Sequence, residues 1–133
     1  MRVLRAAACQ REHLNVAVFP RRISKALGER EAALCVITVV ELAHGIYRAD
    51  APERRERRRV FLDELKAAVT VFPITETTAE LVGGIGAESA ARGVTIPFDD
   101  LLIGACALEH GYAIATRNPR HFKKIPGLTI IPF

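Results

Sequence analysis

Short apolar runs alternate with helical segments from Leu34 to the end of the chain, and this alternation limits the possible folds more than any other feature. The apolar runs have the length of buried strands, whereas the segments between them repeat apolar residues at helical spacing. Strands that are joined by helices pair in parallel, because the helical crossover returns the chain to the same end of the sheet. We therefore expect an α/β fold with a mainly parallel central sheet and helices on both faces.

Capping residues and apolar spacing set the expected bounds of these elements. Strands are expected at 34–37, 71–74, 112–116 and 128–131. Helices are expected from Thr38 as N-cap to about residue 49, at 52–69, from Thr75 or Thr77 to about Gly93, and at 101–110 behind an Asp99 or Asp100 cap.

Residues 1–33 follow no sustained apolar period and lack clean caps. Val3-Leu4 is a candidate for the end of a first strand, 16–19 for another strand, and 23–27 for a short helical turn. We treat residues 1–133 as one domain with an atypical segment at 1–33, and we expect that segment to be the worst-packed part of the chain.

Composition limits the class of protein. Half of the 133 residues are hydrophobic, which is enough for one core, and no apolar stretch is long enough to span a membrane. The apolar run in the opening segment is too short for a signal peptide, so a cytoplasmic protein is expected. The net charge of +4 fits an anionic partner, either a nucleic acid or an acidic protein.

The three cysteines, Cys9, Cys35 and Cys106, are far apart in the sequence and form no C-x-x-C pair. Neither a zinc site nor a disulfide framework is therefore indicated. Cys35 and Cys106 lie in apolar runs, which favours the interpretation that both are small core residues.

Polar side chains lie near three predicted strand ends. Glu41 follows the strand at 34–37 by one helical turn, Asn118 follows the strand at 112–116, and Asp100 with its neighbour Asp99 opens a helix. Ligand sites of parallel sheets form at the carboxyl ends of the strands. Oxygen ligands of this kind suit Mg²⁺ or Mn²⁺.

Each of these residues also has a purely structural interpretation. Glu41 can close a capping box with Thr38, the aspartates can cap their helix, and Asn118 before a proline can form a turn. Taken singly, the structural interpretations are favoured; taken together on one edge, the residues favour a site. For the arginine-rich stretch at 48–59, a solvated helix face is favoured over a phosphate-binding patch.

Three extended segments resemble the motifs of PIN-domain toxins of the VapC type. They are Ile37-Thr-Val-Val-Glu-Leu-Ala-His-Gly-Ile46, Ile96-Pro-Phe-Asp-Asp-Leu-Leu-Ile-Gly-Ala105, and Ala115-Thr-Arg-Asn-Pro-Arg-His-Phe122 followed by Ile125-Pro-Gly-Leu128. They occur in the family's order, and the resemblance covers roughly residues 27–133.

The resemblance implies a metal-dependent endoribonuclease that is the toxin of a toxin–antitoxin pair, with RNA as substrate and a cognate antitoxin as partner. Glu41 matches the family's glutamate, Asp100 its central aspartate and Asn118 its last, weaker ligand, while Asp99 is an additional carboxylate. One or two Mg²⁺ (or Mn²⁺) ions would flank the scissile phosphate. Arg117 and Arg120 are the candidates for RNA binding, with surface charge as the alternative. A homodimer is left open.

The chain departs from the family pattern at its first strand. That strand ends in an aspartate in the family, whereas Arg5 stands at about this place here and no aspartate precedes Asp50. A positive charge at a cation site opposes metal binding, so we expect weak or absent activity. The alternatives are a degenerate PIN domain that binds an antitoxin through an apolar groove at Phe61, Leu62 and Leu65, and a DNA-binding or structural α/β protein.

Overall fold

A five-stranded sheet lies at the centre of the computed structural model, which describes residues 3–5 and 32–132. The strands are β1 (Val3–Arg5), β2 (Ala32–Cys35), β3 (Thr70–Phe72), β4 (Ala113–Thr116) and β5 (Ile130–Pro132). Their order is β3-β2-β1-β4-β5, and every neighbouring pair is parallel. The expected α/β fold with a parallel sheet is confirmed. The candidates at 16–19 and 23–27 lie outside the described residues.

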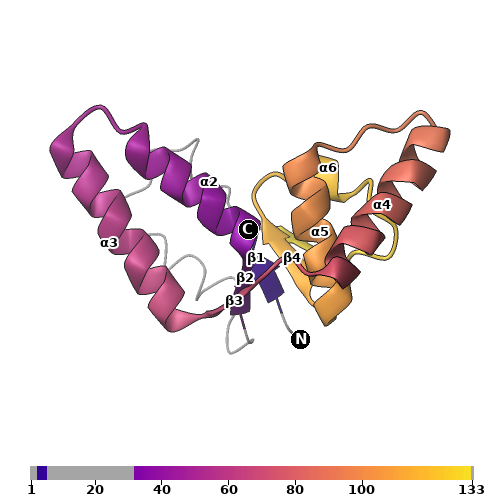
Figure 1. Cartoon of the computed structure of the whole chain (residues 1–133), viewed down its shortest axis with the longest axis horizontal. Coiled ribbons are helices and arrows are strands. Elements are labelled where there is room, and N and C mark those ends of the chain that lie inside the picture. The colour runs from indigo at the N-terminus through magenta and orange to yellow at the C-terminus, as the bar shows by residue number, and fades with distance from the viewer. Residues whose placement is uncertain (1–2, 6–31, 133) are drawn as a thin grey trace.

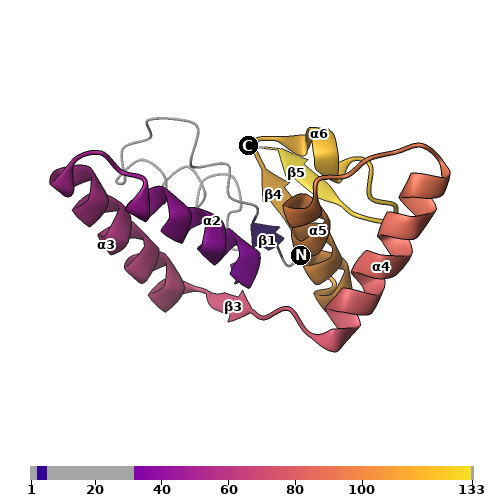
Figure 2. The same cartoon turned by 45° about the horizontal axis from the view of Figure 1, so that its top comes forward.

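The helices of the described part are α2 (Val36–Tyr47), α3 (Pro52–Ala68), α4 (Glu76–Ala91), α5 (Phe98–His110) and α6 (Pro119–Phe122). Helix α2 packs against α3, and α4 packs against α5. The two pairs lie on opposite sides of the molecule, with β3 and its flanking loops running between them (Figures 1 and 2). None of the described helices is both long and apolar enough to cross a membrane.

Strand β1 is the middle strand of the sheet. Its last residue, Arg5, is in register with Leu34 on β2 and with Ala115 on β4. The expectation that residues 1–33 pack poorly is therefore wrong for residues 3–5. Parallel pairing on both sides explains the strand, because two neighbours stabilise a short segment that has no sequence period of its own.

Two expected helix starts are wrong. Helix α2 begins three residues earlier than expected, with Cys35 as N-cap, and Thr38 lies buried inside its first turn. Helix α5 has Pro97 as N-cap, so Asp99 and Asp100 lie within its first turn and do not cap it. In both helices the apolar residues that precede the expected cap are part of the first helical turn. Packing of these residues outweighs the local capping preference. The capping box between Thr38 and Glu41 is thereby excluded.

Other expected boundaries are confirmed. Thr75 is the N-cap of α4 and forms a reciprocal capping box with Thr78. Gly111 ends α5 with a φ of 71°, a left-handed conformation that glycine adopts without strain.

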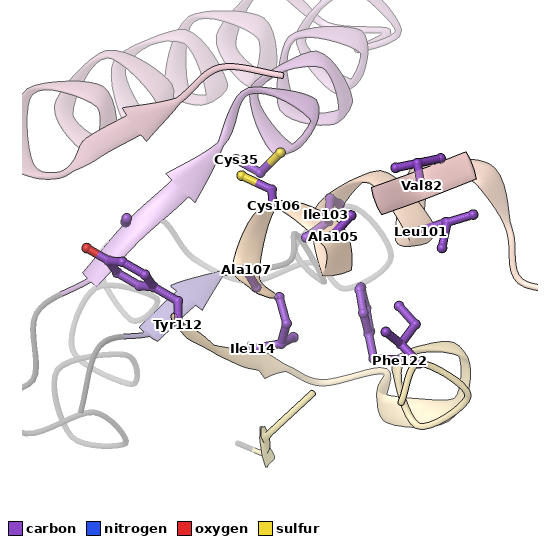
Figure 3. Packing of buried hydrophobic residues seen from close by; sticks show 12 residues of the cluster. Cys35, Val82, Leu101, Ile103, Ala105, Cys106, Ala107, Tyr112, Ile114 and Phe122 are labelled. Atoms are coloured by element: carbon purple, nitrogen blue, oxygen red, sulfur yellow. The ribbon is translucent and has the colours of Figure 1, made fainter. Parts of the chain in front are cut away.

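Helix α5 is the central element of the core. Five consecutive residues, 103–107, are buried, so this helix has no solvent face along that turn. Figure 3 shows its side chains between those of β2, β4 and α6. Gly104 lets Ile125, which follows α6, pack directly on the helix backbone, since a Cβ at this position would collide with the Ile125 side chain. The core therefore fixes α5 and α6 relative to the sheet.

Candidate metal centre

Glu41 is presented by α2, which starts directly at the carboxyl end of β2. Its side chain is half-buried. Burial, followed by the negative charges of Asp100 and Asp99, raises the pKa of Glu41 to about 7. The raised pKa therefore shows a carboxyl group that is partly shielded from solvent and lies near other negative charges.

Asp99 and Asp100 approach Glu41 from the first turn of α5, a helix that packs against α2. Because the charge of each aspartate acts on the Glu41 carboxyl, the three acidic side chains belong to one electrostatic cluster. Asp100 is partly buried, whereas Asp99 is exposed. The charges of Asp100 and Asp99 thus act on Glu41 in the folded protein, while their shared role as metal ligands stays a prediction.

His121 is a residue of this cluster to which the sequence analysis gave no role. Its Nδ1 lies 2.7 Å from Oδ2 of Asp100, and both side chains are largely shielded from solvent. Helix α6 carries His121 one turn after Asn118, so this contact holds the loop after β4 against the start of α5. The signal was present in the sequence, since His121 lies within the motif at 115–122, but nothing in that motif names its partner.

Asn118 and the neighbouring arginines occupy the same loop. The Asn118 backbone N–H donates to Oγ1 of Thr116 at 3.0 Å, and the residue is the N-cap of α6 without a side-chain capping bond. The exposed Asn118 side chain is thus spared for another partner. Arg117 is half-buried and Arg120 is exposed. The roles of Asn118, Arg117 and Arg120 in a site stay predictions.

Comparison with known proteins identifies the architecture. A family model described as PIN domain matches residues 5–128. The chain belongs to the PIN domain family. This PIN domain is 31% identical over 101 residues to the ribonuclease VapC of Rickettsia bellii, covering 76% of this chain and 75% of the relative. It is 28% identical to the tRNA(fMet)-specific endonuclease VapC of Salmonella typhimurium, covering 84% and 83% of the two chains.

Solved structures of other PIN domains share the fold. The VapBC2 complex of Rickettsia felis, bound to a DNA fragment from its promoter, contains a chain with a TM-score of 0.81 and 19% identity, covering 100% of this chain and 99% of that one. The DNA-bound VapBC of Salmonella typhimurium gives a TM-score of 0.79 at 22% identity, with 99% and 98% of the chains covered. At these identities the likeness establishes the fold.

The donor set of this PIN domain fits a hard divalent cation. Mg²⁺ is commonly bound through one or two carboxylates and keeps several waters, and Glu41 with Asp100 offers such a pair. Across residues 3–5 and 32–132, no group of three or more His, Cys, Asp or Glu side chains is gathered closely enough to hold an ion. Metal binding by Glu41 and Asp100 therefore stays a prediction.

Arginines of the stretch at 48–59 form hydrogen bonds within the hairpin of α2 and α3. Arg58 donates to the backbone carbonyl of Gly45, and Arg55 donates to that of Ala49 at 3.2 Å. Arg54, in the first turn of α3, pairs with Asp50 in the loop before that helix at 3.1 Å. These bonds tie α3 to the end of α2, which supports the structural interpretation of the stretch over a phosphate-binding patch.

Proposed function

We propose that this PIN domain is a metal-dependent endoribonuclease of the VapC type, the toxin of a toxin–antitoxin pair, which hydrolyses phosphodiester bonds in RNA. The observation that carries this proposal is the half-buried Glu41, whose pKa is raised by burial and then by the nearby charges of Asp100 and Asp99. Carboxylates that repel one another across two packed helices are suited to hold a divalent cation. The names of the curated VapC relatives support RNA as the substrate class.

Each residue of the site has a separate part in the proposed reaction. Glu41 and Asp100 hold the cation, Mg²⁺ or Mn²⁺, which when bound supplies a Lewis acid beside the scissile phosphate. His121 holds one oxygen of Asp100 and so leaves the other for the cation. Asn118 orients a water or a phosphate oxygen, and Arg117 and Arg120 contact the RNA backbone. The additional carboxylate of Asp99 increases the negative potential of the site.

The end of β1 limits the proposed activity. Arg5 ends the central strand between β2, which leads to Glu41, and β4, which leads to Asn118. Two carboxylates and an amide offset the dehydration of a divalent cation less well than three carboxylates. We therefore propose that cleavage by this chain is weak compared with a version that has aspartate at position 5.

A second candidate function is antitoxin binding without cleavage, which the arginine at the end of β1 favours. The groove expected for this role is wrong in part, because Phe61 and Leu62 are already buried in the hairpin. Exposed apolar side chains on α2 and α3 are instead Val40, Tyr47 and Val60. An antitoxin segment with an apolar helix face would cover these side chains.

Cation binding separates the two candidates. We expect the purified chain to bind Mn²⁺ measurably, and Glu41→Gln and Asp100→Asn each to weaken binding by about tenfold or more. Glu80→Gln, at an exposed position of α4, is the matched control and should bind as the unmodified chain does. Equal Mn²⁺ binding by all four proteins would reject the cation site and leave antitoxin binding as the function.

A further inference from the structure

Two cysteines that lie 71 positions apart in the sequence meet inside the protein. Cys35 is the last residue of β2, and Cys106 lies in the middle of α5. Both are free thiols with 0% of their surface exposed, so the expectation that they are core residues is confirmed. Figure 3 shows the two side chains next to one another, with no other labelled side chain between them.

The surroundings of the two sulfurs make them chemically unequal. The Cys106 thiol forms a hydrogen bond to Cys35, and this bond lowers the pKa of Cys35 and raises that of Cys106. The backbone N–H groups of Ile37 and Thr38, at the start of α2, lower the pKa of Cys35 as well, against the opposing effects of burial and of Glu41. A thiolate is favoured at a helix N-terminus, so Cys35 is the nucleophile of the pair and Cys106 its partner.

We propose that Cys35 and Cys106 are a modification site, at which a small hydroperoxide converts the thiol pair into a reversible disulfide. The Cys35 sulfur attacks one peroxide oxygen, the O–O bond breaks, and the other oxygen leaves and takes up a proton. The Cys106 sulfur then attacks the sulfenic sulfur of Cys35, the S–O bond breaks, and water leaves. The two thiols lose two electrons and two protons in total, and the hydroperoxide is reduced to an alcohol, or water, plus one water. A thiol reductant reverses the bond by exchange.

The position of the pair gives the disulfide a consequence for the rest of the molecule. Cys35 is the N-cap of α2, six residues before Glu41, and Cys106 follows Asp100 by six residues on α5. An S–S bond of about 2 Å is shorter than any non-bonded contact of two sulfurs, so forming it draws these helices together. The spacing of the two carboxylates then depends on the redox state of the cysteines. This consequence rests on the proposed function, whereas the bond itself does not.

Peptide mapping tests the proposal, because trypsin places each cysteine in a different peptide. Cys35 falls in residues 31–48, Cys106 in 93–117 and Cys9 in 6–11. We expect native protein treated with hydrogen peroxide, blocked with iodoacetamide and digested without reductant to yield peptide 31–48 linked to 93–117. The linked pair should lack two hydrogen atoms relative to its two peptides and should disappear after dithiothreitol.

Two controls make the result specific. Protein oxidised in guanidinium chloride loses the native contact, so pairs that contain Cys9 should then appear beside the 35–106 pair. In native Cys106→Ala, no partner remains, and a sulfenic acid at Cys35 should be trapped by dimedone. The proposal is overturned if native protein gives no 35–106 link, if Cys9 pairs are equally abundant in native protein, or if Cys106→Ala leaves Cys35 unreactive.

Discussion

The imidazole Nδ1 of His121 lies 2.7 Å from Oδ2 of Asp100, and this contact joins the loop after β4 to the start of α5. Asp100 is a partly buried carboxylate of the acidic cluster, and the contact occupies one of its two oxygens. A hydrogen bond to one oxygen orients the carboxylate before a cation arrives. His121 is accordingly a positioning residue of the candidate metal centre.

Replacing His121 should loosen cation binding. We predict that His121→Ala weakens Mn²⁺ affinity by about tenfold, because Asp100 loses the bond that orients it. His121→Asn, whose amide can donate from nearly the place of Nδ1, should recover part of that loss. Isothermal titration with Mn²⁺ measures the affinities, with Lys123→Ala as an exposed control from the next turn. Equal losses for His121→Ala and His121→Asn would show that the hydrogen bond has no orienting role.

The stability of the protein should depend on pH through Glu41. The folded protein releases the Glu41 proton at a pKa of about 7, whereas the ordinary value is 4.5. Between these two values the folded state binds more protons than the unfolded chain, so stability falls as the pH rises through this window. Glu41→Gln removes the ionised form and should stabilise the protein at pH 8, by about 1–2 kcal/mol after allowance for partial exposure.

At pH 4 the same substitution should have little effect, because Glu41 is then protonated in both states. Urea unfolding at the two pH values in the presence of EDTA measures the difference. An equal change in the free energy of unfolding at pH 4 and pH 8 would contradict the cause given for the raised pKa of Glu41.

Gly104 should tolerate no side chain. We predict that Gly104→Ala lowers the free energy of unfolding by about 1–3 kcal/mol, since its Cβ meets the buried Ile125 side chain. Gly84→Ala is the matched control, because it lies in the exposed middle of α4 with nothing near its Cβ position. That change should instead stabilise the protein by about 0.5–1 kcal/mol. Denaturant unfolding of both variants measures the contrast, and a stabilised Gly104→Ala would be the contrary result.

The loop arginines should contribute more to RNA affinity than the arginines of α3. We predict that Arg120→Ala weakens binding of a short RNA. It should also reduce the slope of log affinity against log salt concentration by about one. Arg57→Ala, which removes an exposed charge on α3, should change the affinity less. Fluorescence anisotropy in EDTA over a series of salt concentrations separates the two. The RNA-binding role of Arg120 fails if Arg57→Ala has the larger effect.

The sequence was sufficient for the order of elements because apolar spacing and turn residues are local signals. Thr75 and Gly111 illustrate this, since each ends or begins a helix through its own backbone or side chain. Cys35 and Pro97 do not carry such a signal, and packing between elements sets those helix starts. Strand β1 likewise depends on its two parallel neighbours.

In the candidate site, too, single residues could be proposed from the sequence, whereas contacts between distant segments could not. Glu41 and Asp100 were proposed because each lies near the end of a predicted strand or the start of a predicted helix, in a segment that resembles a PIN-domain motif. The contact of His121 with Asp100 and that of Cys35 with Cys106 were not, because each joins segments that only the folded core brings together. Spacing in the sequence contains no information on such pairs.

RNA cleavage by the Arg5→Asp variant tests the central claim most directly. The assay compares the unmodified chain, Arg5→Asp, and Arg5→Asp combined with Asp100→Asn, each with Mg²⁺ and with EDTA. We predict weak or no cleavage by the unmodified chain, clear Mg²⁺-dependent cleavage by Arg5→Asp, and loss of that cleavage when Asp100→Asn is added, because a third carboxylate at the end of β1 completes the ligand set. Full activity of the unmodified chain, or activity of Arg5→Asp that persists in EDTA or with Asp100→Asn, would contradict the account.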